Sequence, residues 1–208
     1  MTNYGKLTLR IITAWFILSL LASALHVFDN APNRPPLALG LSVLLPLGVF
    51  ATWFSRSEGF RQFLFSLDPQ ALTLTQTGRI IGFTFLVLYA YGLLPGVFAL
   101  PAGWGDVAIG VTAPLVAMRV NMRAGRSRFI IWHILGIVDL TLAMILGPIA
   151  ALISPHAITT SAMTVLPLSV IPTFAVPLFL ILHLISIAQA RRWHEVSDGG
   201  HRYAVVGG

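Results

Sequence analysis

FIIWHILGIVDLTLAMILGPIAALI, residues 129–153, contains a single charged side chain, that of Asp139. A bilayer core requires about 20 predominantly apolar residues in a helix, so this stretch is long enough to cross a membrane. The rest of the chain has the same character. Of its 208 residues 56% are hydrophobic and only 10% are charged, against about 25% charged in soluble domains. So few charges could not cover a soluble surface, and the composition therefore predicts an integral membrane protein.

Six runs of this kind follow one another along the chain. They are Leu7–Phe28, Leu37–Phe54, Ile80–Leu100, Trp104–Met118 (which can extend to Asn121), Phe129–Ile153 and Met163–Ala190. We therefore predict an all-α, polytopic transmembrane bundle of six helices over residues 1–190, with a short tail at 191–208. The sixth run contains Pro167, Pro172 and Pro177, which predict a kinked or broken helix and are hinge candidates.

Basic residues are distributed unequally between the two sides of these predicted spans. One side carries Lys6, Arg10, Arg56, Arg61, Arg79, Arg119, Arg123, Arg126, Arg128, Arg191, Arg192 and Arg202, and the other carries Arg34. Because cytoplasmic loops are rich in Lys and Arg, both termini are predicted in the cytoplasm of a bacterium, with the bundle in the inner membrane. The net charge of +6 is then a topology signal and predicts no nucleic-acid partner. An alternative is a cleaved signal peptide ending near Ala22-Ser23-Ala24, which would leave five spans.

The predicted cytoplasmic segment 56–78 is the only sizeable connection between the runs. Phe60, Phe63, Leu64 and Leu67 recur at helical spacing there, which predicts a short amphipathic helix in the membrane surface. Asp68-Pro69 has the pattern of a cap followed by the first residue of a new helix.

Asp139 is the first candidate for a functional site. A carboxylate near the middle of a span costs at least about 2.5 kcal/mol, so it must be paired, protonated or in contact with water. It is either a proton or cation site or a structural group bonded to a neighbouring helix. Asp106 is predicted at the outer start of the fourth helix, where it could cap free amides or bind a cation.

Four further residues complete a predicted ladder of protonatable groups across the membrane. His26 is expected at the outer end, near Asp106, and could pair with it, while Tyr89 is expected at mid-depth with Asp139. His133 and His183 are expected at matching depths near the cytoplasmic side, facing each other from adjacent helices. Paired histidines can also hold a haem iron, so haem is an alternative cofactor, although none is predicted.

Several enzyme classes find no support in the sequence. There is no cysteine, no phosphate-binding glycine loop, no His-Glu-x-x-His zinc motif and no nucleophile elbow. We assign no catalytic residue and no metal site beyond the haem alternative.

Three stretches of the C-terminal half carry a resemblance: Pro101–Val107, Trp132–Leu140 and Ile171–Pro177, the last followed by His183-Leu184. In these stretches the chain resembles a group of small bacterial inner-membrane proteins that has no assigned activity. The resemblance implies a bacterial membrane protein and points to Asp106, Asp139 and His183, but it implies no function.

The leading functional hypothesis is a small proton- or cation-coupled carrier with Asp139 at its centre. Interrupted helices near the midplane are typical of transporter sites. The alternatives are a haem-binding redox subunit and a non-catalytic subunit that packs, through stripes of small residues, against a copy of itself or a larger complex.

Overall fold

The computed structural model describes residues 3–29, 37–120, 125–153 and 159–193, and every regular element in these ranges is a helix. Six helices among the described residues are long and apolar enough to cross a membrane. The predicted all-α bundle of six helices is therefore confirmed. Arg34, Asn121 and residues 194–208 of the predicted tail lie outside the described residues.

The membrane-length helices follow one another along the chain. Their bounds are α1 Asn3–Ala24, α2 Leu37–Arg56, a third helix made of α4 Pro69–Thr75, η1 Gln76–Gly82 and α5 Phe83–Ala90, then α6 Gly96–Met118, α7 Arg126–Ile153, and a sixth made of the π-helix η4 Ile171–Ala175 and α8 Val176–Arg192. Two short helices, α3 Glu58–Phe65 and the 3₁₀-helix η3 Thr160–Thr164, lie outside these spans.

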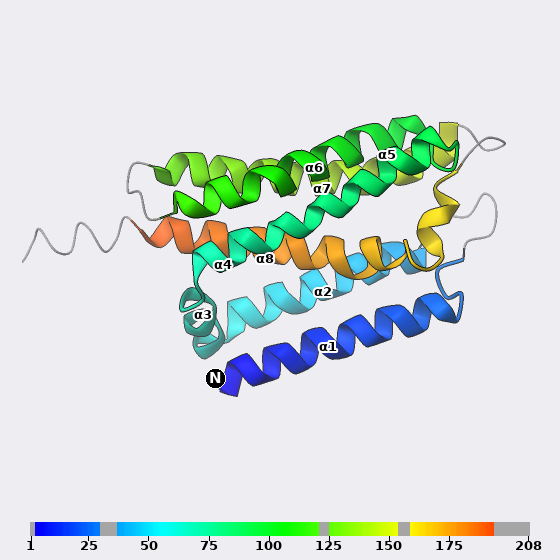
Figure 1. The fold of residues 1–208 in the computed structure, drawn as a ribbon. Helices are drawn as coiled ribbons and strands as arrows, with labels where there is room; N and C mark the ends of the chain where they lie inside the picture. Colours follow the sequence, from blue (N-terminus) through cyan, green and yellow to red (C-terminus); the bar gives the residue numbers. More distant parts are fainter. Residues whose placement is uncertain (1–2, 30–36, 121–124, 154–158, 194–208) are drawn as a thin grey trace, which may run out of the picture.

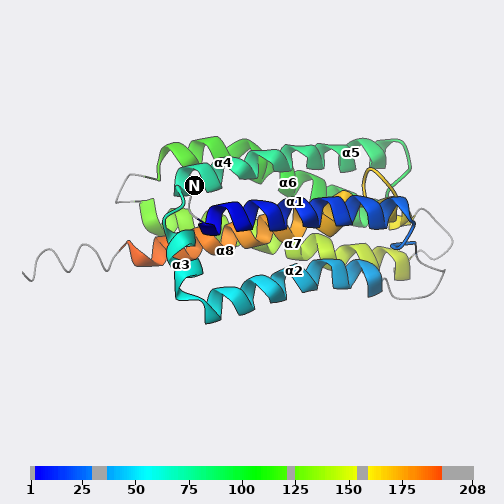
Figure 2. The same ribbon diagram turned by 90° about the horizontal axis from the view of Figure 1, so that it is seen from below.

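The start of α1, the short helix α3 and the end of α8 all lie at one end of the bundle (Figures 1 and 2). We call this the α3 end and the opposite one the far end. The start of the first span and the end of the last span lie at the same end because the number of spans is even (Figure 1). Each long helix therefore runs antiparallel to the one before it in the chain.

The third and fourth spans differ from those predicted. The third helix begins at Pro69 instead of residue 80, and the turn that follows lies between Ala90 and Gly96. Pro101, predicted in a loop, is inside α6. The prediction was wrong because Arg79 was assigned to a cytoplasmic loop, since an isolated arginine is costly inside a membrane. Arg79 is inside the bundle, and this shifts both spans.

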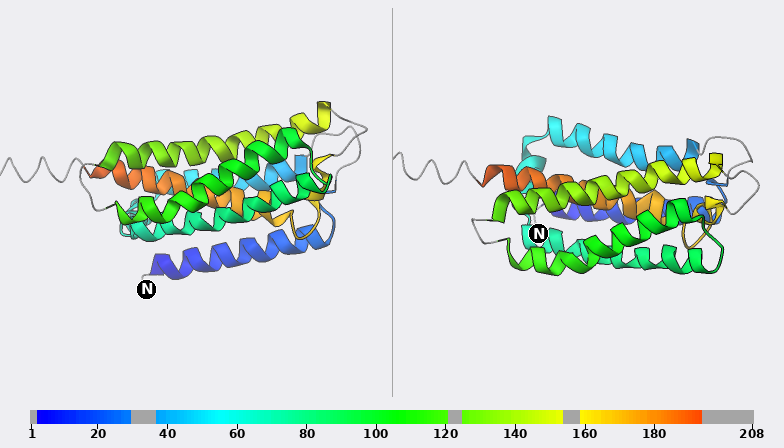
Figure 3. Two further views of the ribbon diagram at one scale, coloured as in Figure 1. Left: turned by 45° about the horizontal axis from the view of Figure 1, so that its top comes forward. Right: turned by 90° about the horizontal axis from the view of Figure 1, so that it is seen from above.

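Helices α1 and α2 are the least buried part of the bundle. In the most apolar 18-residue stretch of each helix, only 11% of the residues of α1 and 6% of those of α2 are buried. The corresponding share is 44% for both α6 and the sixth helix. Helix α1 runs along the outside of the bundle (Figure 3, left). Lipid is the expected neighbour of such exposed apolar faces, whereas a polar group in the bundle has to find its partner among the better buried helices.

The prolines of the sixth span break its regularity, as predicted. Pro167 lies in a turn before the helix, Pro172 is inside η4, and Pro177 is in the first turn of α8. Pro177 has no N–H to donate to the carbonyl of Thr173, four residues earlier. This carbonyl instead accepts Nε1–H of Trp15 at 3.2 Å and the hydroxyl of Ser19 at 3.5 Å. The interruption thus provides the attachment point for α1.

Helix α3 packs its apolar face against the protein. Phe60 and Leu64 are buried, and Phe60 stacks on Trp53 of α2 with ring centroids 3.9 Å apart. Ser57 is the N-cap of α3. Asp68 is the N-cap of α4 and Pro69 is its first residue, as the Asp68-Pro69 pattern predicted. The predicted amphipathic helix exists, but its most apolar side chains contact the bundle and not the membrane surface.

Candidate functional site

Arg79 occupies the centre of the buried polar network. It is in η1, and its side chain is only 1% exposed. Its Nε donates to Oδ1 of Asp106 on α6 at 2.7 Å, and one terminal nitrogen donates to Oδ2 of Asp139 on α7. The other terminal nitrogen lies 3.2 Å from the carbonyl of Gly136 and 3.2 Å from Nε2 of His183. One guanidinium therefore connects four helical segments.

The charges of this network do not cancel. Arg79 contributes one positive charge, and ionised Asp106 and Asp139 contribute two negative charges. Burying charge is tolerated when it is paired and hydrogen-bonded. The arrangement satisfies both conditions for the guanidinium, but one cation can balance only one of the two carboxylates. The second carboxyl group must then carry a proton or be balanced by another cation.

Three glycines allow the helices to approach closely around the network. A Cβ atom at Gly105 would overlap the Asp139 carboxylate, and one at Gly82 would overlap the side chain of Asp106. A Cβ atom at Gly136 would overlap the ring of His183. Small residues are the usual means of close helix packing in membranes, and at these three positions they make room for charged and polar groups.

His133 and His183 lie beside Arg79, toward the α3 end. Both are fully buried, and their Nδ1 atoms are 2.7 Å apart, which is a hydrogen bond between the rings. Trp132 packs edge-on against both rings and donates its Nε1–H to the hydroxyl of Thr112 on α6 at 2.9 Å. The network is thereby enclosed by α6, α7 and α8.

This arrangement does not fit the haem alternative. An axial pair needs an iron and a porphyrin plane between two ring nitrogens, with each metal–nitrogen bond about 2 Å long. The facing nitrogens of His133 and His183 are 2.7 Å apart and bonded to each other, and Nε2 of His183 is taken by Arg79. In the part of the chain that the structure describes, no three His, Cys, Asp or Glu side chains group to hold a metal ion.

The structure brings together four of the six predicted polar site residues, namely Asp106, Asp139, His133 and His183. Asp106 is not at the outer start of its helix, as expected, but in the middle of α6, where it is buried. His26 does not meet Asp106. It is exposed in the turn after α1 and lies 3.1 Å from Asp29. Tyr89 is 43% exposed near the end of α5, away from the network.

Arg79 is the residue that sequence reasoning missed. A signal for it was present, because pairing was one of the explanations for Asp139 near mid-span, and no basic residue lay in the middle of any predicted span to pair with it. Arg79 directly preceded the predicted third span.

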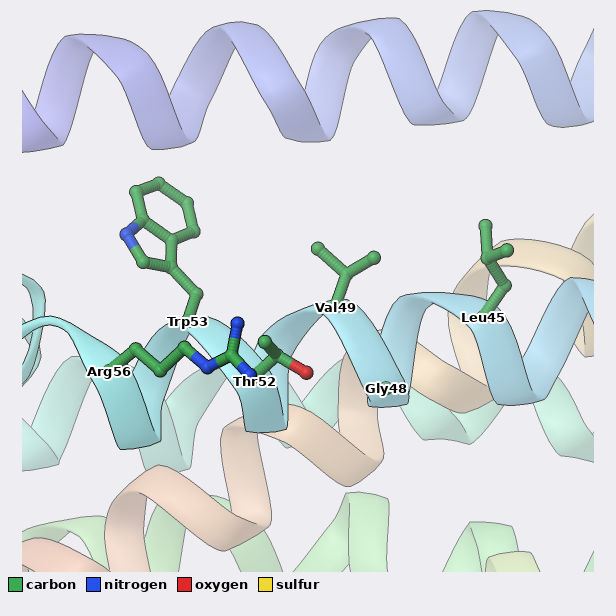
Figure 4. A pocket seen from close by; sticks show the side chains of 6 residues that line it. All are labelled: Leu45, Gly48, Val49, Thr52, Trp53 and Arg56. Carbon is green, nitrogen blue, oxygen red and sulfur yellow. The ribbon is translucent and has the colours of Figure 1, made fainter.

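A concave surface outside the buried network lies on α2. It is a shallow apolar groove of about 640 Å³ lined by Leu45, Gly48, Val49, Thr52, Trp53 and Arg56. Leu45, Val49 and Trp53 point from α2 toward α1 (Figure 4). Arg56 is the only titratable side chain of this lining, so the groove does not share the chemistry of the buried network.

The fold and the site define a six-helix, multi-pass membrane protein with a buried arginine–carboxylate–histidine network. The chain belongs to the family described as Domain of unknown function (DUF8737), whose model matches residues 35–191. That range contains every residue of the network and begins after α1. No curated protein and no solved structure matches the chain.

Proposed function

We propose that the protein is a small proton- or cation-coupled carrier and that the network of Arg79, Asp106 and Asp139 is its coupling site. The observation that supports this most directly is the presence of two carboxyl groups around a single guanidinium that is 1% exposed. A purely structural ion pair needs only one carboxylate. The second carboxylate gives the site a reason to bind a proton or a cation, and intramembrane carboxylates commonly mark such pathways.

The position of the site agrees with a carrier. One helix that lines the site is not regular α-helix there, because Arg79 is in the 3₁₀ segment η1, and the helix that carries His183 begins with the π-helix η4. Irregular helical segments concentrate at functional sites and provide hinges, and transporters use interrupted helices at their binding sites. Protonation of Asp139 would remove one of the two carboxylates that hold Arg79, which gives a physical means of coupling.

We also propose that the membrane is the bacterial cytoplasmic membrane and that the α3 end faces the cytoplasm. Described basic residues gather at that end: Lys6, Arg10, Arg56, Arg61, Arg119, Arg126, Arg128, Arg191 and Arg192. The excess of Lys and Arg on one side of the membrane persists when Arg79 is no longer counted as a loop residue. By sequence, Arg34 is still the single basic residue predicted in loops of the other side.

The test is a current measurement on proteoliposomes adsorbed to a solid-supported membrane. A jump in pH, in sodium, or in one of a panel of amino acids, sugars and organic cations is applied, and the protein-dependent charge movement is recorded. We expect a current for a pH or cation jump that is lost in Asp139→Asn. Asp29→Asn removes an exposed carboxylate outside the network and should leave the current intact. No current with any solute, or an undiminished current in Asp139→Asn, would contradict the proposal.

A further inference from the structure

The hydrogen-bond directions around the two histidines can be derived from Arg79. A guanidinium has only donors, so Nε2 of His183, 3.2 Å from an Arg79 nitrogen, must present a lone pair. A neutral His183 then carries its proton on Nδ1. That proton is donated over 2.7 Å to Nδ1 of His133, which must accept it. A neutral His133 therefore carries its own proton on Nε2.

The chain of donors ends on an atom without an acceptor. Nε2 of His133 is buried and has no hydrogen-bond partner among the described residues. The whole side chain is 0% exposed. Buried N–H groups in native proteins are almost always paired with protein or with ordered water, so an acceptor is required at this position.

Further buried polar atoms without a partner among the described residues continue from the histidine pair toward the α3 end. On α8 the hydroxyl of Ser186 and Oε1 of Gln189 follow His183 at steps of three residues, and both are in this group. The amide nitrogen of Gln189 donates to the carbonyls of Leu64 and Leu67, each at 2.9 Å, at the end of α3. The row therefore reaches from His183 to the end of the bundle.

We propose that His133 and His183 form a proton relay that binds water at Nε2 of His133 and connects the Arg79–Asp106–Asp139 site with the α3 end. This proposal rests on the proposed function and adds the route of the proton. The charged and titratable groups that face the pair are Arg79 and, through it, the two aspartates. Its other ring neighbours are Trp132 and Phe129.

The proton balance of the relay is one in and one out. When Arg79 moves off His183, Nε2 of His183 accepts a proton from the site, Nδ1–H of His183 passes to Nδ1 of His133, and Nε2–H of His133 passes to the bound water. Neither ring gains a net charge. Arg79 can return to His183 only when a lone pair again faces it. Net transfer in one direction therefore requires both rings to reorient, each with its single proton, before the next proton enters.

Solid-state NMR of ¹⁵N-histidine-labelled protein in lipid bilayers tests the relay without any transport. We expect the Nδ1–H tautomer for His183, the Nε2–H tautomer for His133, and magnetisation transfer from water to Nε2–H of His133. Ser186→Ala should lower this transfer by about half, because a water held by several partners loses one of them. Ser42→Ala is the matched control, since the Ser42 hydroxyl is already bonded to the carbonyl of Leu39 on α2. The Nδ1–H tautomer for His133, or no transfer from water, overturns the relay.

The current measurement separates this proposal from the proposed function. His133→Phe keeps an aromatic ring against Phe129 and should lower the pH-jump current by about tenfold or more, as expected for loss of a proton-transfer group. A wild-type current that persists undiminished in His133→Phe overturns the relay and leaves the carrier intact. Absence of the wild-type current overturns the carrier, whatever the tautomers are.

Discussion

Nε of Arg79 donates to Oδ1 of Asp106 over 2.7 Å, and this bond joins the third membrane helix to α6 inside the bundle. The same guanidinium holds Asp139 on α7. Two carboxyl groups thus share one cation, and we expect the network to tolerate the loss of one carboxylate charge better than the loss of its single positive charge.

Replacement of Arg79 should destabilise the protein far more than replacement of either aspartate. Arg79→Met leaves two buried carboxylates without a cation, and breaking a buried pair from one side typically costs about 3–5 kcal/mol. Asp106→Asn or Asp139→Asn leaves a neutral pair and should cost much less. Thermal unfolding in detergent, followed by size-exclusion chromatography, measures the difference. Equal losses of stability in the three variants would contradict this charge argument. The variant that combines Arg79→Met, Asp106→Asn and Asp139→Asn should recover part of the stability lost in Arg79→Met alone, because it buries no unpaired charge.

Gly105→Ala should destabilise the contact between α6 and α7. The added methyl group would overlap the Asp139 carboxylate, and overpacking a tight interface costs about 1–3 kcal/mol. Gly147→Ala on α7 is the matched control, because no atom lies within 4 Å of the Cβ position there. That control should be neutral or gain up to about 1 kcal/mol from the better helix propensity of alanine. The unfolding midpoint should therefore fall in Gly105→Ala and stay unchanged or rise in Gly147→Ala, and an equal fall in both variants would count against the close approach.

Trp15 and Pro177 should be energetically coupled although they are on different helices. Trp15→Phe removes the donor to the Thr173 carbonyl and should cost about 0.6 kcal/mol, within the range measured for hydrogen bonds between membrane helices. Pro177→Ala restores a backbone N–H that can bond this carbonyl within the sixth membrane helix. In that background Trp15→Phe should cost less. A double-mutant cycle on unfolding free energies measures the coupling, and a cycle that closes at zero would show that the proline does not prepare the acceptor.

The orientation of the bundle can be tested by cysteine labelling, because the chain has no cysteine of its own. Glu58→Cys places a thiol in α3 and Asp29→Cys places one at the far end, both at exposed side chains. In intact cells a membrane-impermeant maleimide should label Asp29→Cys, and Glu58→Cys should react only after permeabilisation. The reverse pattern would refute the cytoplasmic position of the α3 end.

Part of the site could be predicted from the order of residues along the chain. Asp139 stood out because a charge in the middle of an apolar run has few explanations, and His133 and His183 could be paired because their distances from the span ends match. Asp106 was selected but placed at the wrong depth, since the turn before α6 was expected at Pro101–Gly103. His26 and Tyr89 were included on depth alone, and depth does not reveal which face of a helix meets a neighbour.

By itself the sequence determined the class of protein, the number of spans and the break in the sixth helix. These properties depend on local quantities, namely the length of apolar runs and the position of prolines, which a chain carries in every conformation. Only the tertiary structure decided that Arg79 belongs inside the bundle. The cost of a buried arginine is offset by partners that are distant in sequence, Asp106 and Asp139, and their proximity exists only once η1, α6 and α7 have packed through Gly82, Gly105 and Gly136.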